Sequence, residues 1–368
     1  MRIVVSGHNG FIGGHLVRSV NLNYPNAEVL LLERKDFKSQ NFGSKIEKND
    51  FIFHLAGVNR ADTEEEVVEE NKELNLALIN HLIKIKFSGT LFFSSSLQED
   101  TNTLYGKVKK EARLEFDRLS GELGFKFYFL KIPNVFGPFC KPNYNSFIAT
   151  FSDKLIKNET PDIIQDNSVV LIYINDLIHS ILQLLEDHSP KINAEVLHEY
   201  KVSEVLKKLL SFKERYLDKN EFPELNTFFD LNLFNTFRSY IDVKTAYPKK
   251  HILHSDQRGF FSELSRSGSK GQSSFSITKP EITRGNHFHT RKVERFSVIK
   301  GKARIQLRKY LTDEIISFEL DGHSPSFVDM PVWYTHNITN IGDEELLTFF
   351  WINEPYDEND PDTYMENV

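Results

Sequence analysis

The first half of the chain alternates between short apolar runs and longer stretches with a helical period. Residues 2–6 form an apolar run rich in β-branched side chains, which predicts a buried strand. From Phe11 onward the apolar positions recur at helical spacing, which predicts a helix. Further strands are expected at 28–32, 50–57 and 90–93, and a long helix at 63–85. Strands that alternate with helices predict a doubly wound parallel sheet.

The pattern changes near residue 247. Residues 202–240 are helical and rich in aromatic side chains, but beyond Pro248 short alternating runs replace the helical period. Strands are expected at 296–298, 303–308 and 346–352, with turns at Gly301 and Gly342. We therefore predict two domains, residues 1–246 with an α/β Rossmann-type sheet and residues 247–368 with an all-β barrel.

The turn after the first strand has the spacing of a phosphate-binding loop. Gly7, Gly10 and Gly13 would permit a tight turn, a close approach to a pyrophosphate and close helix packing, respectively. Phe11 and Ile12 lie in the same turn, at the start of a helix whose N–H groups attract anions. An ordinary βα turn is the alternative, but the strand before it and the helix after it favour a dinucleotide site.

Composition narrows the class of protein. The 368 residues are 40% hydrophobic and 26% charged, as in globular proteins, and the formal charge of −7 argues against a general nucleic-acid binder. No apolar run is long enough for a membrane span, and the chain enters a strand at once, without the pattern of a signal peptide. Cys140 is the sole cysteine, which is typical of a reducing compartment. We predict a cytoplasmic protein.

The end of the second strand carries charges that select a nicotinamide cofactor. An acidic residue there binds a ribose hydroxyl, whereas an arginine accommodates a 2′-phosphate. This chain has Glu33, Arg34 and Lys35 in succession. The alternative is that each of these three residues is an ordinary charged residue on the protein surface, with no contact to a cofactor. Because Arg34 and Lys35 together can neutralise a phosphate dianion, we predict NADPH as the cofactor.

A second motif can deliver a proton to a carbonyl group. Tyr105 and Lys109 are four residues apart and therefore share a helix face. The lysine ammonium is expected to lower the pKa of the phenol. A serine of the triplet 94–96 is expected to hold the carbonyl oxygen that receives the proton. An exposed helix face is the alternative. The serine-tipped strand and the glycine turn favour catalysis by this set.

These motifs resemble those of the extended short-chain dehydrogenase/reductase family, which acts mostly on nucleotide-linked sugars. The resemblance implies that Ser96 is the catalytic hydroxyl and that Leu55, Ala56 and Gly57 lie under the cofactor. It also makes Asn71 structural and places Asn134, in the stretch 131–138, near the substrate. A second signature is Tyr173-Ile174-Asn175-Asp176. His54, next to Leu55, is expected to be a core histidine.

The second domain contains a group of potential metal ligands. His287 and His289 are two apart and point to one side of a strand, and Glu294 and His336 can complete a site of three histidines and one carboxylate. Such ligands suit a divalent metal such as zinc. Each histidine alone would more often be an ordinary polar residue. The combination at this spacing predicts a metal centre.

The same stretches resemble the two motifs of the cupin family, a metal- or sugar-binding β-barrel. Trp333 replaces a glycine that is usual in the second motif, and we expect it to narrow the barrel mouth. The residues around Arg258 and Arg284 also resemble dTDP-4-keto-6-deoxyglucose 3,5-epimerases, which implies that both arginines bind substrate. In those enzymes the histidine at the position of His287 is the base. Since His287 cannot be both base and ligand, we favour the ligand.

The pairing of both domains closely resembles the CapF-type family of bifunctional capsular-polysaccharide enzymes, including the stretches 141–146 and 361–364. The resemblance implies C3 epimerisation of a UDP-2-acetamido-2,6-dideoxy-4-ketohexose and then NADPH-dependent C4 reduction, towards UDP-N-acetyl-L-fucosamine. It also implies a homodimer. Two alternatives stay open: a reductase whose cupin domain only binds sugar or holds a dimer, and a non-catalytic redox sensor. Ser96, Tyr105 and Lys109 argue against the sensor.

Overall fold

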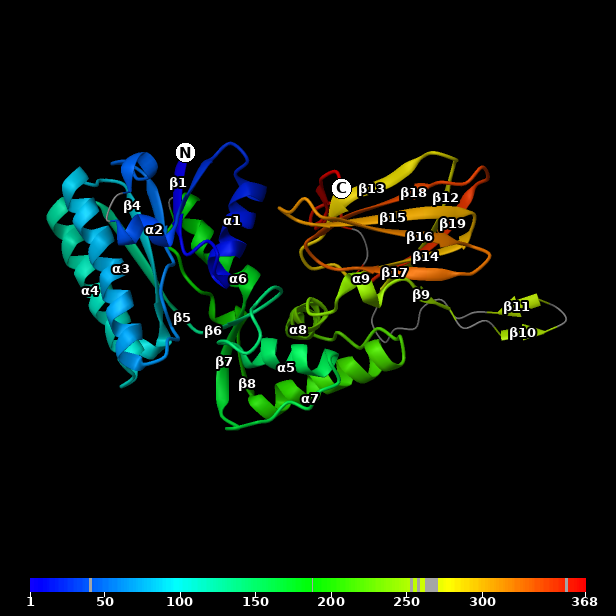
Figure 1. The fold of residues 1–368 in the computed structure, drawn as a ribbon, viewed down its shortest axis with the longest axis horizontal. Helices are drawn as coiled ribbons and strands as arrows, with labels where there is room; N and C mark the ends of the chain where they lie inside the picture. The colour runs from blue at the N-terminus through cyan, green and yellow to red at the C-terminus, as the bar shows by residue number, and fades with distance from the viewer. Residues whose placement is uncertain (40–41, 187, 252–253, 257–258, 262–270, 355–356) are drawn as a thin grey trace. The chain divides into compact units, whose positions relative to one another are not determined.

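The protein is described by a computed structural model, and Figure 1 shows its fold. The structure describes residues 1–39, 42–186, 188–251, 254–256, 259–261, 271–354 and 357–368. The chain forms two compact units. Unit 1 comprises Met1–Phe136, Tyr144–Ser146 and Asn167–Tyr200, and unit 2 comprises Gly137–Asn143, Phe147–Asp166 and Lys201–Val368.

Unit 1 is built on a parallel sheet with the strand order β2-β1-β3-β4-β5. Its strands are β1 (Arg2–Ser6), β2 (Glu28–Leu32), β3 (Phe51–His54), β4 (Thr90–Ser96) and β5 (Lys126–Ile132). The order reverses at β1, so the crevice for a ligand is expected at the carboxyl ends of β1 and its neighbours.

Two helix pairs cover this sheet (Figure 1). On one face α3 (Glu64–Ile85) and α4 (Leu104–Leu123) pack beside each other, with α2 (Arg34–Lys38) against α3. On the other face α1 (Phe11–Asn23) packs against α6 (Ile174–Leu182). A short sheet of β6 (Asn134–Phe136), β7 (Ser168–Tyr173) and β8 (Leu197–Lys201) completes the unit.

Local sequence explains where the long helices begin. Thr63 caps α3 by accepting a hydrogen bond from Glu66 N, and the Glu66 carboxylate accepts in return from Thr63 N. Thr103 caps α4 in the same manner, through Gly106 N. The buried apolar faces of both helices then meet the sheet in one core cluster, which includes Ile52, Leu78 and Phe116. The cap at Thr103 therefore fixes the start of the helix that carries Tyr105 and Lys109.

Unit 2 contains a helical part, formed by α5 (Phe147–Ile156), α7 (Val202–Phe212), a π-helix (Lys213–Asp218), α8 (Phe228–Arg238) and α9 (Val243–Ala246). The predicted helical region 202–240 is thus interrupted between Lys219 and Thr227. Of the aromatic side chains there, Phe229, Phe234 and Phe237 are core residues, at most 1% exposed, whereas Phe228 is 77% exposed.

The rest of unit 2 consists of two antiparallel five-stranded sheets with the orders β12-β19-β14-β17-β9 and β16-β15-β18-β13-β20. The strands are β9 (Lys249–Lys250), β12 (Gln272–Thr278), β13 (Thr283–Phe288), β14 (Glu294–Lys300), β15 (Lys302–Lys309), β16 (Ile315–Asp321), β17 (Ser326–Met330), β18 (Tyr334–Asn340), β19 (Leu346–Ile352) and β20 (Tyr364–Met365). A separate hairpin joins β10 (His254–Asp256) and β11 (Gly259–Phe261).

The predicted fold class is confirmed: a Rossmann-type parallel sheet is followed by an antiparallel β domain of cupin type. The domain boundary predicted at 246/247 lies inside unit 2, where the helices of 201–246 group with the β domain. That boundary stays a prediction. Among the described residues, no helix is both long enough and apolar enough to cross a membrane.

Candidate functional site: a dinucleotide pocket and a buried histidine cluster

The glycine turn has the geometry that a bound pyrophosphate requires. Gly7 lies in the left-handed region at φ +73°, and a Cβ on Gly13 would lie 2.1 Å from Gly7 O. Larger residues at these two positions would therefore strain or separate β1 and α1. The N-cap of α1 is Gly10, which offers no capping side chain. The first N–H groups of the helix are left for an anionic ligand.

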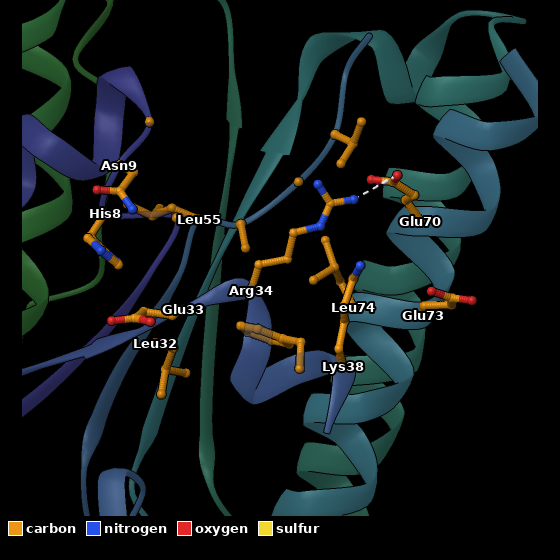
Figure 2. A pocket seen from close by; sticks show the side chains of 16 residues that line it. His8, Asn9, Leu32, Glu33, Arg34, Lys38, Leu55, Glu70, Glu73 and Leu74 are labelled. Carbon is orange, nitrogen blue, oxygen red and sulfur yellow. Dashed lines mark ion pairs between the residues drawn. The ribbon is translucent and has the colours of Figure 1, made fainter. Parts of the chain in front are cut away.

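A pocket of about 300 Å³ opens beside this turn (Figure 2). Of the predicted cofactor-binding residues, Gly7, Gly10, Arg34, Leu55, Ala56 and Gly57 line it. Phe11, Ile12 and Gly13 instead form the first residues of α1, outside the lining. The pocket therefore joins the carboxyl ends of β1, β2 and β3, where a dinucleotide is expected in such a sheet.

The charges at the β2 end of the pocket differ from the predicted arrangement. Arg34 extends over the pocket, and its Nη2 lies 2.8 Å from Oε1 of Glu70 on α3 (Figure 2). Lys35 pairs with Glu33 at 2.6 Å and does not line the pocket, whereas Lys38 does. Arg34 and Lys38, rather than Arg34 and Lys35, are the cations available to a phosphate in this pocket.

The end of β4 and the start of α4 carry the predicted proton-transfer residues, which do not line the pocket themselves; of these, Lys109 contacts a residue of its lining. Gly106 packs so closely on the turn after Ser96 that a Cβ there would lie 1.9 Å from Gln98 O. Lys109 Nζ donates to Ser94 O at 3.0 Å and would lie 3.1 Å from a Cβ on Gly57. Because Gly57 lines the pocket, the lysine stands beside the expected cofactor position.

The pKa values of these groups are set mainly by burial. Burial raises the pKa of Tyr105 to about 12, with Tyr144 as a second cause, and lowers the pKa of Lys109 to about 8. A net lowering of the phenol pKa by Lys109 is therefore not observed in the unliganded protein, because desolvation of the phenol outweighs the effect of the nearby ammonium. A protonated phenol at neutral pH suits a proton donor, which is the role that reduction requires.

The three serines of the triplet 94–96 have different surroundings. Ser94 Oγ lies 3.4 Å from His54 O, and Ser95 Oγ donates to the buried Glu99 carboxylate. Ser96 Oγ accepts from Gln98 N at 3.2 Å and is only partly buried, at the strand end. Ser96 is thus the serine of the triplet that is best placed to meet a substrate oxygen.

Sequence reasoning missed a buried ion pair behind this strand. The Glu99 side chain is fully buried and accepts from Arg113 Nε at 2.9 and 3.1 Å as well as from Ser95. It anchors the turn between Ser96 and α4 on the helix that carries Lys109. The sequence around Ser95 and Glu99 gives no signal of this role. The partner of Glu99 is Arg113, which lies 14 residues further along the chain, one helical turn after Lys109 on α4.

His54 and Asn71 have the structural roles that the sequence predicted for them. His54 is fully buried between Ser6 Oγ at 2.8 Å and Asn75 Oδ1 at 3.0 Å, and burial lowers its pKa to about 3. Asn71 links α3 to the loop after β3, since its side-chain amide donates to Val58 O at 2.5 Å and accepts from Val58 N at 3.1 Å. Both hold the pocket wall in place.

Unit 2 contains a second candidate site between its two sheets. His287 on β13 lies opposite His336 on β18, His289 follows β13, and Glu294 begins β14. One ligand atom from each of the four residues lies within 4.8 Å of the others. Glu294 Oε2 is 3.1 Å from Nε2 of both His289 and His336. All four predicted ligands therefore converge.

The cluster fits a divalent metal. Nε2 of His289, Nε2 of His336 and Oε2 of Glu294 are buried and make no hydrogen bond of good geometry with any described residue, a state that is costly without a ligand. Burial would raise the pKa of the Glu294 carboxyl, but the neighbouring His289 and His336 hold it well below its usual range. Burial and the two other histidines lower the pKa of His287 to about 4, so its imidazole is neutral.

Trp333 does not enter this cluster. Its φ is +61°, and its ring is 1% exposed and packs on Phe288 and Tyr310. Phe288 lies between His287 and His289 on the chain and therefore faces the other side of the strand. The expected narrowing of the barrel mouth is not observed, because the indole is buried on the opposite side of β13.

The predicted substrate-binding residues have separate surroundings. Asn134 is exposed on β6, with its side-chain amide 3.5 Å from Val170 O. Arg284 is exposed on β13, and its Nε donates to Thr278 Oγ1 at 2.9 Å. Arg258 lies outside the described residues. Their role in substrate binding stays a prediction.

Comparison with known proteins covers both units. The NAD dependent epimerase/dehydratase family matches residues 3–197, and the polysaccharide biosynthesis C-terminal domain matches residues 254–364. A UDP-2-acetamido-2,6-beta-L-arabino-hexul-4-ose reductase from Pseudomonas aeruginosa is 31% identical over 100% of this chain and 99% of its own. The spore coat polysaccharide biosynthesis protein SpsL from Bacillus subtilis is 27% identical over 31% of this chain and 82% of its own.

A solved structure extends the likeness to three dimensions. The capsular polysaccharide assembling protein CapF from Staphylococcus aureus is 33% identical, covers 100% of both chains and superposes with a TM-score of 0.65. The chain therefore belongs to the NAD dependent epimerase/dehydratase family and is, over its whole length, a CapF-type chain with a polysaccharide biosynthesis C-terminal domain.

Proposed function

We propose that the protein is a bifunctional enzyme of UDP-sugar metabolism. Its β domain inverts C3 of a UDP-2-acetamido-2,6-dideoxy-4-ketohexose, and its Rossmann-type domain then reduces the C4 ketone with NADPH, towards UDP-N-acetyl-L-fucosamine for surface polysaccharide. The observation that carries the reductase half is the position of Lys109, one helical turn after Tyr105 and against Gly57 of the pocket lining. The name of the Pseudomonas aeruginosa relative supports the 4-keto sugar.

The residues of unit 1 have distinct roles in the reduction. NADPH supplies the hydride. Tyr105 donates its phenolic proton to the C4 oxygen as that oxygen gains charge, and Ser96 donates a hydrogen bond to the same oxygen. The Lys109 ammonium, held by Ser94 O, stabilises the phenolate that remains on Tyr105. Arg34 and Lys38 attract the 2′-phosphate of the cofactor.

The cluster in unit 2 supplies the electrostatics for epimerisation. We propose that His287, His289, Glu294 and His336 hold one divalent metal, most simply zinc, which would supply positive charge to stabilise the oxygen anion that forms when the C3 proton is removed. A ketone at C4 is what makes the C3 proton acidic, so epimerisation has to precede reduction. Substrate contacts of Asn134, Arg258 and Arg284, and a homodimer, belong to the same proposal.

Deuterium exchange tests the epimerase half directly. The wild-type protein, incubated with the UDP-4-keto sugar in deuterated water without cofactor, is expected to place deuterium at C3, because enolisation needs no hydride. Nuclear magnetic resonance of the sugar detects the loss of the C3 proton signal. A zinc-loaded, folded protein that reduces the ketone with NADPH but exchanges no C3 proton would contradict the epimerase role.

The alternative is a reductase whose β domain only binds sugar or holds a dimer. One observation favours it: the full-length relative from Pseudomonas aeruginosa is named as a reductase alone. The exchange experiment separates the two functions, since a binding domain leaves C3 unlabelled.

Cofactor selection is expected to depend on Arg34. Replacing Arg34 with alanine should raise the KM for NADPH roughly ten- to a hundred-fold, because a charge-assisted hydrogen bond contributes about 1.5–3 kcal/mol, and should change the KM for NADH little. Steady-state kinetics with both cofactors measure this. The matched control is Lys35→Ala, which should alter neither value because Lys35 pairs with Glu33. An equal rise in the KM for NADPH and the KM for NADH would exclude a contact between Arg34 and the 2′-phosphate.

A further inference from the structure

The C-terminal segment 360–366 is built into the sheet that carries the histidine cluster. β20 pairs with β13 so that Met365 lies opposite His287 and Tyr364 opposite Phe288. The rings of Phe288 and Tyr364 stack with centroids 5.3 Å apart, and Glu366 N donates to Asn286 O at 2.9 Å. The last residues of the chain are therefore part of the site's framework.

Asp362 closes the turn that follows His289. Its side chain is buried, and its carboxylate accepts from the backbone N–H groups of Thr290, Arg291 and Lys292 at 3.1, 3.0 and 3.1 Å. The Thr290 hydroxyl donates a fourth hydrogen bond at 2.7 Å. Four donors on one buried carboxylate fix the position of Asp362 and the path of residues 290–292 together.

The same residue contacts the imidazole of His289 through its main chain. His289 Nδ1 lies 2.5 Å from Asp362 O. A carbonyl oxygen only accepts, so Nδ1 carries a proton, and in the neutral imidazole that binds a metal the lone pair is then on Nε2. This Nε2 is the atom that lies 3.1 Å from Glu294 Oε2 in the cluster. The contact therefore selects both the tautomer and the ring orientation that a metal ligand needs.

We infer that Asp362 is a positioning residue of the metal centre: its carboxylate fixes the turn after His289, and its carbonyl oxygen aims the His289 imidazole at the metal. The inference rests on the metal centre proposed above. Groups that orient a ligating histidine typically change metal affinity 10- to 100-fold when they are altered. The carboxyl-terminal segment is thus expected to contribute to zinc affinity without supplying a ligand.

The chain offers a matched control in the same segment. Asp360 pairs with Arg291, Nη2 to Oδ2 at 2.8 Å, but it is exposed. Its side chain binds the same turn from outside, through the guanidinium of Arg291. Asp360→Asn therefore removes a carboxylate from the same segment while leaving the path from Asp362 to the imidazole intact.

Zinc affinity and metal-dependent stability test the inference. In the full-length protein, Asp362→Asn is expected to weaken zinc binding 10- to 100-fold in chelator competition, because the new amide N–H group faces backbone donors. The rise in melting temperature on adding zinc should shrink in proportion. Thr290→Val, which removes one of the four hydrogen bonds, should have a smaller effect of the same kind, and Asp360→Asn should bind zinc as the wild type does.

The contrary outcomes are distinct. If Asp362→Asn lowers the melting temperature of the metal-free protein but keeps wild-type zinc affinity, its role is only structural and the inference is wrong. If the wild type itself binds no zinc or other divalent metal, the proposed metal centre and this inference both fall. If zinc binds but C3 exchange is absent, the epimerase proposal alone falls.

Discussion

Replacing Tyr105 with phenylalanine is expected to slow reduction of the 4-keto sugar roughly 10²–10⁴-fold, the range for loss of a positioned general acid. No phenol is then left to protonate the C4 oxygen as hydride arrives. Exchange of the C3 proton should survive, because the histidine cluster lies in the other unit of the chain. Single-turnover oxidation of NADPH and labelling of C3 in deuterated water measure the two activities separately.

The control for this variant is Tyr128→Phe, which removes another half-buried phenol of the same unit, on β5. It should reduce the ketone at the wild-type rate. Equal rates for Tyr105→Phe and the wild type would remove Tyr105 from the mechanism. Loss of C3 exchange together with reduction, in a protein that still binds NADPH and zinc, would show that the two activities are not independent.

Replacing His336 with alanine is expected to abolish metal binding and C3 exchange. The side chain is fully buried, and its Nε2 is one of the atoms that converge on Glu294 Oε2. The free energy of ligation also stabilises the fold, so the melting transition of unit 2 should fall. Elemental analysis, C3 labelling and thermal unfolding report these effects, while NADPH binding should be unchanged. Any reduction that remains should give a product with C3 uninverted.

Two further variants separate ligation from packing. His336→Gln keeps more of the side-chain volume and should also lose the metal, which would exclude a cavity as the cause. His323→Ala removes an exposed histidine, 86% accessible and paired with Asp321, and should keep the metal. Full metal content in His336→Ala would contradict the assigned ligands. If the wild type contains no metal, His287 becomes the candidate base.

Local patterns in the sequence predicted much of the fold and both sites. The turn at Gly7–Gly13, the pair Tyr105 and Lys109, and the strand positions of His287 and His289 each depend on residues close in sequence. Their geometry follows from the period of a helix or a strand. For this reason the structure could bring together every one of the four predicted metal ligands.

Contacts between distant segments were not predictable in this way. Glu70 meets Arg34 from a different helix, and Asp362 meets His289 across 73 positions of the chain. Nothing near either partner in sequence marks these pairs. The raised pKa of Tyr105 is a second kind of failure, since spacing gives the distance to Lys109 but not the burial that outweighs it. Trp333 was misplaced because its ring packs on Phe288 and Tyr310, which are distant in sequence and which no local pattern places beside it.

The chain segments that make up unit 2 determine where the protein can be truncated without exposing buried groups. Asp329 on β17 pairs with Arg295 at 2.7 Å and also accepts from Tyr216 of the π-helix, while Phe222 stacks on Trp351 at 4.2 Å. A fragment that starts at residue 247 would lose Tyr216 and Phe222 and leave a buried carboxylate with fewer donors and a large indole uncovered. The β domain is therefore not expected to fold when it is separated from the helices of unit 2. Fragments or fusion proteins that contain residues 247–368 alone should aggregate, whereas those that keep all segments of unit 2 together should remain soluble.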